Sequence, residues 1–119
     1  LVTDRERLTE LLSPFPEIDL VGYVQDGTEA LATFQSLLPD VVVVSLASDV
    51  GLGRDLIRGI HMARPSAVVV MHTRQASSPL RRLWLALGVD YFLDTDFELE
   101  SLIGIVVAHR SENRPFVVL

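Results

Sequence analysis

Residues 41–44 read Val-Val-Val-Val, and residues 67–71 read Ala-Val-Val-Val-Met. Both are short, unbroken runs rich in β-branched residues, and such runs favour strands. A strand that is apolar on both faces indicates burial on both faces, as in a parallel sheet flanked by helices. These two runs therefore predict the centre of a parallel α/β sheet.

Segments whose apolar residues recur at helical spacing separate the apolar runs along the chain. We expect strands at residues 1–2 (as the end of a strand), 18–24, 41–44, 67–71 and 90–93, and helices at 5–12, 27–38, 54–63, 79–87 and 97–109. Strands that alternate with helices predict βαβ units with right-handed crossovers. The predicted fold class is α/β: a flavodoxin-like, doubly wound, five-stranded parallel sheet of order 2-1-3-4-5 with helices on both faces.

The chain length of 119 residues fits one domain. We expect this domain to span residues 1–112, with residues 113–119 as a C-terminal tail or the start of a linker. The tail ends in Phe-Val-Val-Leu, so it could pack back on the domain, begin a linker or engage a partner. Leu1-Val2 reads as the tail of a strand, and we expect the numbered chain to be a fragment of a longer protein.

The composition excludes several classes of function. The chain has no cysteine, which rules out disulfides and thiolate metal sites and favours a cytoplasmic location. Its net charge of -6 opposes binding of nucleic acid by this domain. No apolar run approaches the ~20 residues of a membrane span. All ten basic residues are arginine, so no mechanism here can use a lysine ammonium.

Four stretches resemble the response-regulator receiver domain of the CheY-like superfamily, and they follow the order found in that family. They are LVTD (1–4), DLVGYVQDGTEAL (19–31), LPDVVVVSL (38–46) and LALGVDYFLDTDFELESL (85–102). The resemblance covers nearly the whole chain. It implies a signalling protein of a bacterial two-component-type pathway.

In that family an aspartate at the end of the third strand accepts a phosphoryl group, two acidic residues after the first strand hold Mg²⁺, and a lysine ends the fifth strand. The resemblance places Ser45 at the acceptor position and Thr95 at the lysine position. It places Thr3 and Asp4 at the acidic pair, so one of the two carboxylates remains. The resemblance therefore identifies this chain as a degenerate member of the family.

Two further positions keep the residue types that read out the phosphoryl group in the family. Thr73 matches the hydroxyl residue that ends the fourth strand, and Phe92 matches the aromatic residue that changes rotamer with it. We expect these residues to be switch-like at most, because the charged groups that would drive the switch are replaced. For Thr73 a fixed hydrogen bond at the strand end is the simpler interpretation.

The replaced charges predict a phosphorylation-independent pseudo-receiver that is not an enzyme and has no catalytic residue. A hydroxyl such as that of Ser45 is a poor nucleophile without an adjacent base. We expect no cofactor and at best weak Mg²⁺ binding at Asp4, since one carboxylate anchors the ion poorly. The alternative is a working phosphoacceptor that uses Ser45 or a relocated aspartate. A flavodoxin-type small-molecule binder is a third hypothesis, but residues 3–6 lack a phosphate-cradling run.

The helix at residues 79–87 carries the candidate interface. An exposed tryptophan beside arginines is typical of a protein interface, although burial of Trp84 in the core is an equal alternative. The resemblance implies a homodimer or a protein partner bound through the fourth helix, the fifth strand and the last helix. The candidate residues are Arg81, Arg82, Trp84 and Tyr91.

Overall fold

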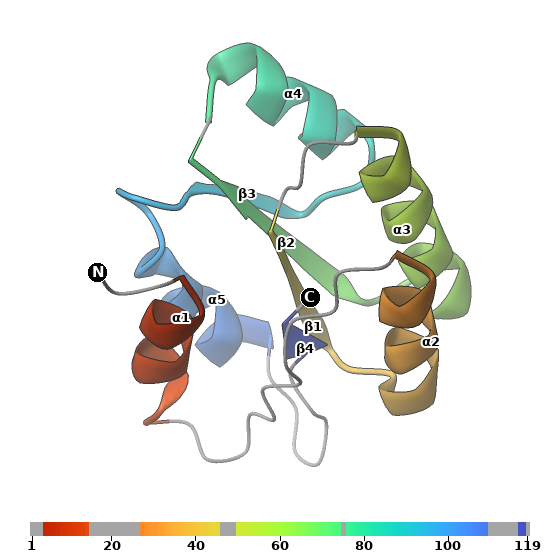
Figure 1. The fold of residues 1–119 in the computed structure, drawn as a ribbon, viewed down its shortest axis with the longest axis horizontal. Helices are drawn as coiled ribbons and strands as arrows, with labels where there is room; N and C mark the ends of the chain where they lie inside the picture. Colours follow the sequence, from red (N-terminus) through yellow and green to blue (C-terminus); the bar gives the residue numbers. More distant parts are fainter. Residues whose placement is uncertain (1–3, 15–26, 46–49, 75, 110–116, 119) are drawn as a thin grey trace.

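The computed structural model describes residues 4–14, 27–45, 50–74, 76–109 and 117–118. The helices are α1 (Asp4–Leu12), α2 (Gly27–Leu37), α3 (Val50–Ala63), α4 (Ser78–Ala86) and α5 (Ser101–His109). The strands are β1 (Val41–Ser45), β2 (Val68–Thr73), β3 (Tyr91–Asp94) and β4 (Val117–Val118). Figure 1 shows the sheet between α1 and α5 on one side and α2 and α3 on the other.

The described strands form one parallel sheet of order β3-β2-β1-β4. The predicted parallel α/β class is therefore confirmed. The strands predicted at residues 1–2 and 18–24 lie outside the described residues, so the five-stranded order 2-1-3-4-5 stays a prediction. Val117 and Val118 pair with Val42 and Val43 of β1. Of the three alternatives given above for the C-terminal tail, this pairing agrees with packing back on the domain.

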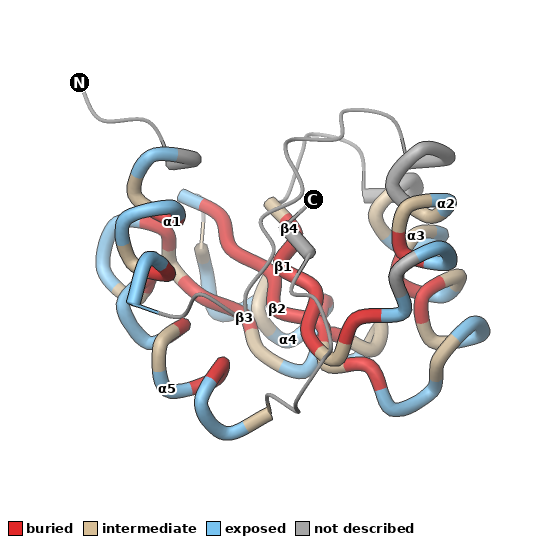
Figure 2. Tube along the Cα trace, turned by 90° about the horizontal axis from the view of Figure 1, so that it is seen from below, coloured by how far each residue is buried: buried red, intermediate tan, exposed pale blue. Residues whose placement is uncertain are grey.

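The valine run of β1 is buried on both faces, as its sequence predicts (Figure 2). Val42 and Val44 belong to a core cluster with Phe34, Ile57 and Trp84, which come from α2, α3 and α4. The alternate valines of β1 belong to a second cluster, formed mainly with α1 and α5; its members from these elements include Val41, Val43, Leu8, Leu12, Leu102 and Val106. The sheet thus separates two apolar layers.

β1 and β2 place valine opposite valine at three consecutive positions, from Val41↔Val68 to Val43↔Val70. Polar contacts at the start of the two strands hold them in this register. The main-chain N–H of Val68 donates to the carbonyl oxygen of Asp40 over 2.9 Å. The guanidinium of Arg64 bonds the Asp40 carboxylate and the carbonyl oxygen of Leu38, both over 2.6 Å. A hydrogen-bonded clamp therefore marks the amino end of β1.

Two predicted helix starts are wrong. α3 begins at Val50 and not at residue 54, so residues 50–53 are helical rather than part of a loop. Gly53 serves packing there, because a Cβ atom at this position would lie 2.7 Å from the Trp84 ring. α5 begins at Ser101 and not at residue 97, because the preceding residues form turns.

The boundaries of α4 agree with its sequence signals. Ser77 caps the helix by accepting a hydrogen bond from the main-chain N–H of Leu80, and Pro79 lies in the first turn. Gly88 follows the helix with a φ of 111°, a left-handed conformation that favours glycine. Among the described residues, no helix combines the length and apolar character that crossing a membrane requires.

Candidate functional site

The candidate site lies at the carboxyl ends of the parallel strands, where doubly wound sheets bind their ligands. Ser45 is the last residue of β1, and its register partner is His72 of β2. Thr73 ends β2 opposite Asp94, the last residue of β3. The main-chain N–H of Thr95 then donates to the carbonyl oxygen of Thr73 over 3.0 Å. The fold therefore brings three predicted site residues, Ser45, Thr73 and Thr95, to one edge of the sheet.

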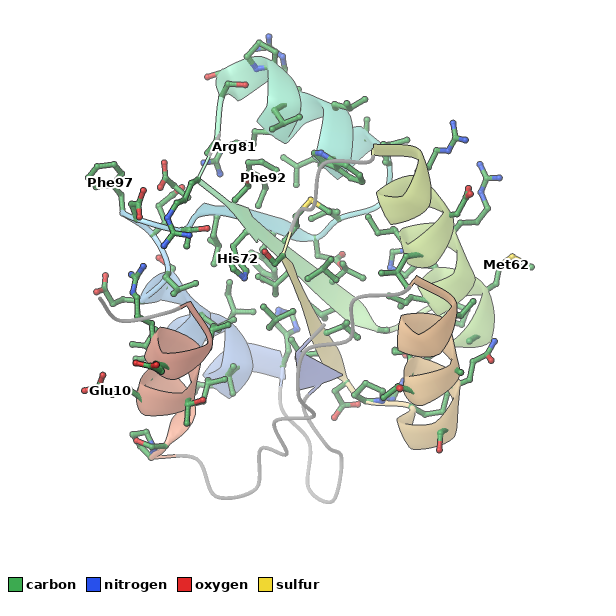
Figure 3. The ribbon with its side chains drawn as sticks, in the orientation of Figure 1. Glu10, Met62, His72, Arg81, Phe92 and Phe97 are labelled. Atoms are coloured by element: carbon green, nitrogen blue, oxygen red, sulfur yellow. The ribbon has the colours of Figure 1, made fainter. Side chains whose placement is uncertain are left out.

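Thr95 points into the protein and not toward solvent. Its side chain is 1% exposed, and its Oγ1 atom lies 2.9 Å from Nδ1 of His72, which is also 1% exposed. His72 lies between the sheet and the α1 and α5 layer (Figure 3). Thr95, which the resemblance places at the lysine position, thus has its hydroxyl engaged in a buried hydrogen bond. The two residues are 23 positions apart in the chain, so no local sequence pattern predicts this contact.

A different cation lies beside this position. Arg7 of α1 donates a hydrogen bond from Nη1 to the main-chain oxygen of Thr95 over 2.9 Å. The contact joins residues 88 positions apart, so sequence spacing gives no signal for it. Arg7 binds the backbone and holds α1 against the turn after β3.

The carboxylates of Asp94, at the end of β3, and of Asp96, just after it, form hydrogen bonds in and beside that turn. Oδ1 of Asp94 accepts hydrogen bonds from the main-chain N–H groups of Asp96 and Phe97 over 2.9 and 3.3 Å. Oδ1 of Asp96 accepts from Nε of Arg74 over 3.2 Å, and both side chains are about half exposed. Thr3 and the side chain of Asp4 lie outside the described residues. In the described parts of the chain, no group of three or more His, Asp or Glu side chains is placed to hold a metal ion.

The Phe92 ring is held in a buried position by α4. Phe92 is 2% exposed and belongs to the core cluster of α2, α3 and α4. The guanidinium of Arg81 lies over this ring and donates to the main-chain oxygen of Phe92 over 2.5 Å (Figure 3). Thr73, on the neighbouring strand, is also buried. The two predicted switch-like residues thus lie on adjacent strands, with the aromatic ring turned inward.

Glu98 forms an ion pair with Arg81, and it was not among the site residues predicted from sequence. Its Oε1 atom accepts from Nη2 of Arg81 over 2.8 Å and from the main-chain N–H of Asp94 over 2.9 Å. The Arg81 hydrogen bond, aided by that of Asp94, lowers the pKa of Glu98 below its ordinary value of 4.5. The only sequence signal was an acidic residue four positions after Asp94. Arg81 and Glu98 together tie α4, β3 and the following turn.

The predicted interface residues do not share one surface. Trp84 is fully buried, which corrects its assignment to an exposed interface and supports the alternative of core burial. Leu80, Trp84 and Leu87 all pack in the same cluster, and their spacing of four and three residues defines the inner face of α4. The helical period alone could have indicated this.

The exposed face of α4 carries other residues. Leu83 and Leu85 are 42% and 44% exposed, and Arg82 is exposed beside them. Tyr91 is half-buried, and its hydroxyl lies 2.8 Å from Nε2 of His109 in α5. The surface that could meet a partner is therefore aliphatic and basic, without the tryptophan.

No family model matches this chain. In sequence it is similar to a protein-glutamate methylesterase/protein-glutamine glutaminase of Symbiobacterium thermophilum, with 39% identity over 90 residues, 73% of this chain and 25% of that protein. It is 28% identical over 107 residues to the transcriptional regulatory protein LnrK of Bacillus subtilis, covering 90% of this chain and 49% of LnrK. The chain thus spans about a quarter to a half of the length of these relatives.

Among solved structures, the chain is similar to the chemotaxis protein CheY4 of Vibrio cholerae, with a TM-score of 0.69 and 22% identity. The match covers 89% of this chain and 88% of CheY4. At this identity the match shows the fold alone. The chain therefore has the CheY-like α/β fold.

Proposed function

We propose that this domain is a pseudo-receiver: a protein-binding signalling module of a two-component-type pathway that acts without phosphorylation and is not an enzyme. One observation carries the proposal. Thr95, at the position of the family's lysine, is buried and hydrogen-bonded to His72. No other lysine can supply the ammonium, because the chain contains none.

The electrostatics of phosphoryl transfer support this proposal. The reaction is catalysed mainly by positioned charges that stabilise the transferred group. Ser45 ends β1 at the described edge of the sheet, and the resemblance assigns it to the position of the nucleophilic carboxylate. Asp94 and Asp96 bind the turn and Arg74, so their carboxylates are already engaged. We infer that phosphoryl transfer to this site is too slow to act as a signal.

Treatment with acetyl phosphate and Mg²⁺ tests the proposal. We expect the intact mass of the purified chain to stay unchanged, while a receiver domain with the acceptor aspartate gains a phosphoryl group in parallel. Beryllofluoride with Mg²⁺ should leave the fluorescence of Trp84, the single tryptophan, unchanged. A phosphoprotein that is lost in Ser45→Ala would defeat the proposal and support the alternative of a non-standard acceptor.

We also propose that the module binds a second copy of itself or another protein through α4, β3 and α5. Support comes from the exposed Leu83 and Leu85 beside Arg82, since an aliphatic patch with arginine suits a protein interface. The absence of cysteine suits a location in the cytoplasm, which is part of the proposal.

Light scattering can test the surface. The double variant Leu83→Glu/Leu85→Glu should remove self-association without unfolding, because both side chains are partly in solvent. Met62→Glu is the matched control, since Met62 is 79% exposed on α3, away from α4 (Figure 3). If the α4 variant associates as strongly as the control, this surface is not the self-association site.

A further inference from the structure

Strand β3 forms one edge of the described sheet, since β2 is its one neighbour among the described strands. The main-chain N–H of Thr95, just after β3, donates to the carbonyl oxygen of Thr73 in β2. Because main-chain polar groups alternate in direction along a strand, Leu93 also faces β2, while Phe92 and Asp94 direct their N–H and C=O groups to the open edge. Such an edge can pair with a strand of another chain.

Groups from two other elements occupy this edge. Nη1 of Arg81, in α4, donates to the carbonyl oxygen of Phe92 over 2.5 Å (Figure 3). Oε1 of Glu98, in the turn after β3, accepts from the main-chain N–H of Asp94 over 2.9 Å. The main-chain N–H of Glu98 donates to the carbonyl oxygen of Asp94 over 2.8 Å. Polar groups at the edge of β3 are therefore bonded within the chain.

An ion pair joins the two side chains that lie on this edge. Nη2 of Arg81 donates to Oε1 of Glu98 over 2.8 Å, and both side chains are 39% exposed. Each of them thus bonds the strand and the other side chain. We call this pair of side chains, Arg81 and Glu98, the edge cover. Because water reaches both charges, the ion pair is weak and can open without unfolding of the core.

We propose that the edge cover is a removable barrier to strand pairing: when it opens, β3 of a second copy of this chain adds to the edge, antiparallel about a two-fold axis. A two-fold axis brings the same edge of both copies together, and two such edges can share main-chain hydrogen bonds. The charges also complement one another, because Arg81 released from Glu98 can pair with the partner subunit's Glu98. This proposal rests on the self-association through α4, β3 and α5 proposed above, and it names the partner and the contact that controls it.

Removal of the Glu98 side chain tests the proposal in the full chain. Glu98→Ala releases Arg81 and the N–H of Asp94, so dimers should form with a Kd lower than that of the unmodified chain by about tenfold or more. Glu100→Ala, at an exposed position in the same turn, is the matched control and should leave the Kd unchanged. Sedimentation measures both variants.

The size of the assembly gives a further criterion. Pairing about a two-fold axis uses the β3 edge of both copies, so association should stop at the dimer. Association of unfolded chains would continue to larger species. Equal Kd values for the two variants, or open-ended aggregation of Glu98→Ala, would overturn the proposal.

Amide hydrogen exchange locates the contact. In Glu98→Ala, exchange of the Asp94 N–H should slow as the protein concentration rises, because a group on the partner strand then accepts its hydrogen bond. In Glu100→Ala this rate should not depend on concentration, since Glu98 still accepts from the N–H. A rate that is independent of concentration in dimeric Glu98→Ala would mean that the dimer does not pair through β3.

Two further substitutions separate the edge from the exposed face of α4. Leu83→Ser/Leu85→Ser, added to Glu98→Ala, removes exposed aliphatic area without adding charge. The edge dimer should persist. If it is lost, association runs through the α4 face, which supports the proposed function and contradicts the role of the edge cover. If it persists while the serine substitutions leave the unmodified chain unaffected, the α4 face is not the self-association site and the edge cover stands.

Discussion

The guanidinium carbon of Arg81 lies 5.3 Å from the centroid of the Phe92 ring, and the same side chain donates to the Phe92 carbonyl oxygen. A third contact joins it to Glu98. This one side chain therefore holds α4 against β3 and keeps the aromatic ring inside. The inward position of the Phe92 ring is thus accompanied by an arginine contact from α4.

Arg81→Met should destabilise the fold, because it removes these polar contacts and leaves Phe92 and Glu98 without their cation. We expect a loss of about 1–3 kcal/mol in the free energy of unfolding. Urea denaturation followed by Trp84 fluorescence measures it. Arg82→Met, at the exposed neighbouring position, should change stability by less than about 0.5 kcal/mol. Equal effects of the two variants would show that the Arg81 contacts contribute nothing.

Glu98 should make stability depend on pH in the acid range. Its pKa is lowered in the folded state, so the ionised form stabilises the fold above the ordinary value of 4.5. This stabilisation is lost as pH falls through the lower folded pKa. Because the side chain is 39% exposed, solvent screening keeps the effect modest.

The measurement compares urea midpoints from about pH 6 down to about pH 3, the range in which carboxylates titrate. Glu98→Gln should show a smaller decline than the unmodified chain over the acid part of this range. The exposed neighbour Glu100 offers the matched control, and Glu100→Gln should decline like the unmodified chain. Parallel curves for all three proteins would contradict the assigned role of Glu98.

Thr95→Val should remove the buried hydrogen bond to His72 while keeping the side-chain volume. We expect a loss of about 1–3 kcal/mol, because a buried polar atom loses its partner. The double variant Thr95→Val/His72→Leu removes both polar groups. Its loss should be smaller than the sum of the single losses by about 1 kcal/mol. Strict additivity would mean that the two side chains are not coupled.

Two helical glycines should respond to alanine in opposite directions. Gly53→Ala places a Cβ atom 2.7 Å from the Trp84 ring, so the ring must move and stability should fall. At Gly104 nothing lies within 4 Å of the added atom, and the higher helix propensity of alanine should stabilise α5 by up to about 1 kcal/mol. Thermal melting of both variants measures the contrast. A stabilised Gly53→Ala would show that Trp84 is loosely packed.

The central strands could be predicted from sequence because apolar runs that are buried on both faces leave a plain local signal. The runs at residues 41–44 and 67–71 became β1 and β2. The start of α3 could not be predicted from sequence. Glycine is typical of loops, and the reason for Gly53 in a helix is its close approach to Trp84, which only the structure shows. The exposure of Trp84 likewise depended on which face of α4 meets the sheet, although its spacing from Leu80 and Leu87 was informative.

For the candidate site, the sequence predicted which residues lie at the strand ends but not which residues contact them. Resemblance placed Ser45, Thr73 and Thr95 at strand ends, and the parallel sheet brings those ends to one edge. The partners of these residues come from elsewhere in the chain: Arg7 is 88 positions from Thr95, and His72 is 23 positions from it. Such pairings depend on tertiary packing, so no local pattern encodes them.

The facing valines of β1 and β2 leave the alignment of these strands poorly encoded by their side chains. A shift of two residues would keep every side chain on its face and would still oppose Val43 to Val68. The information that selects the native alignment then resides in polar atoms at the strand start, where Asp40 accepts from Val68 and binds Arg64. A folding chain that closed this ion pair late would sample misaligned parallel pairings of β1 and β2 with nearly equal burial. The correct alignment of β1 with β2 therefore depends on the ion pair of Asp40 and Arg64 at the start of β1.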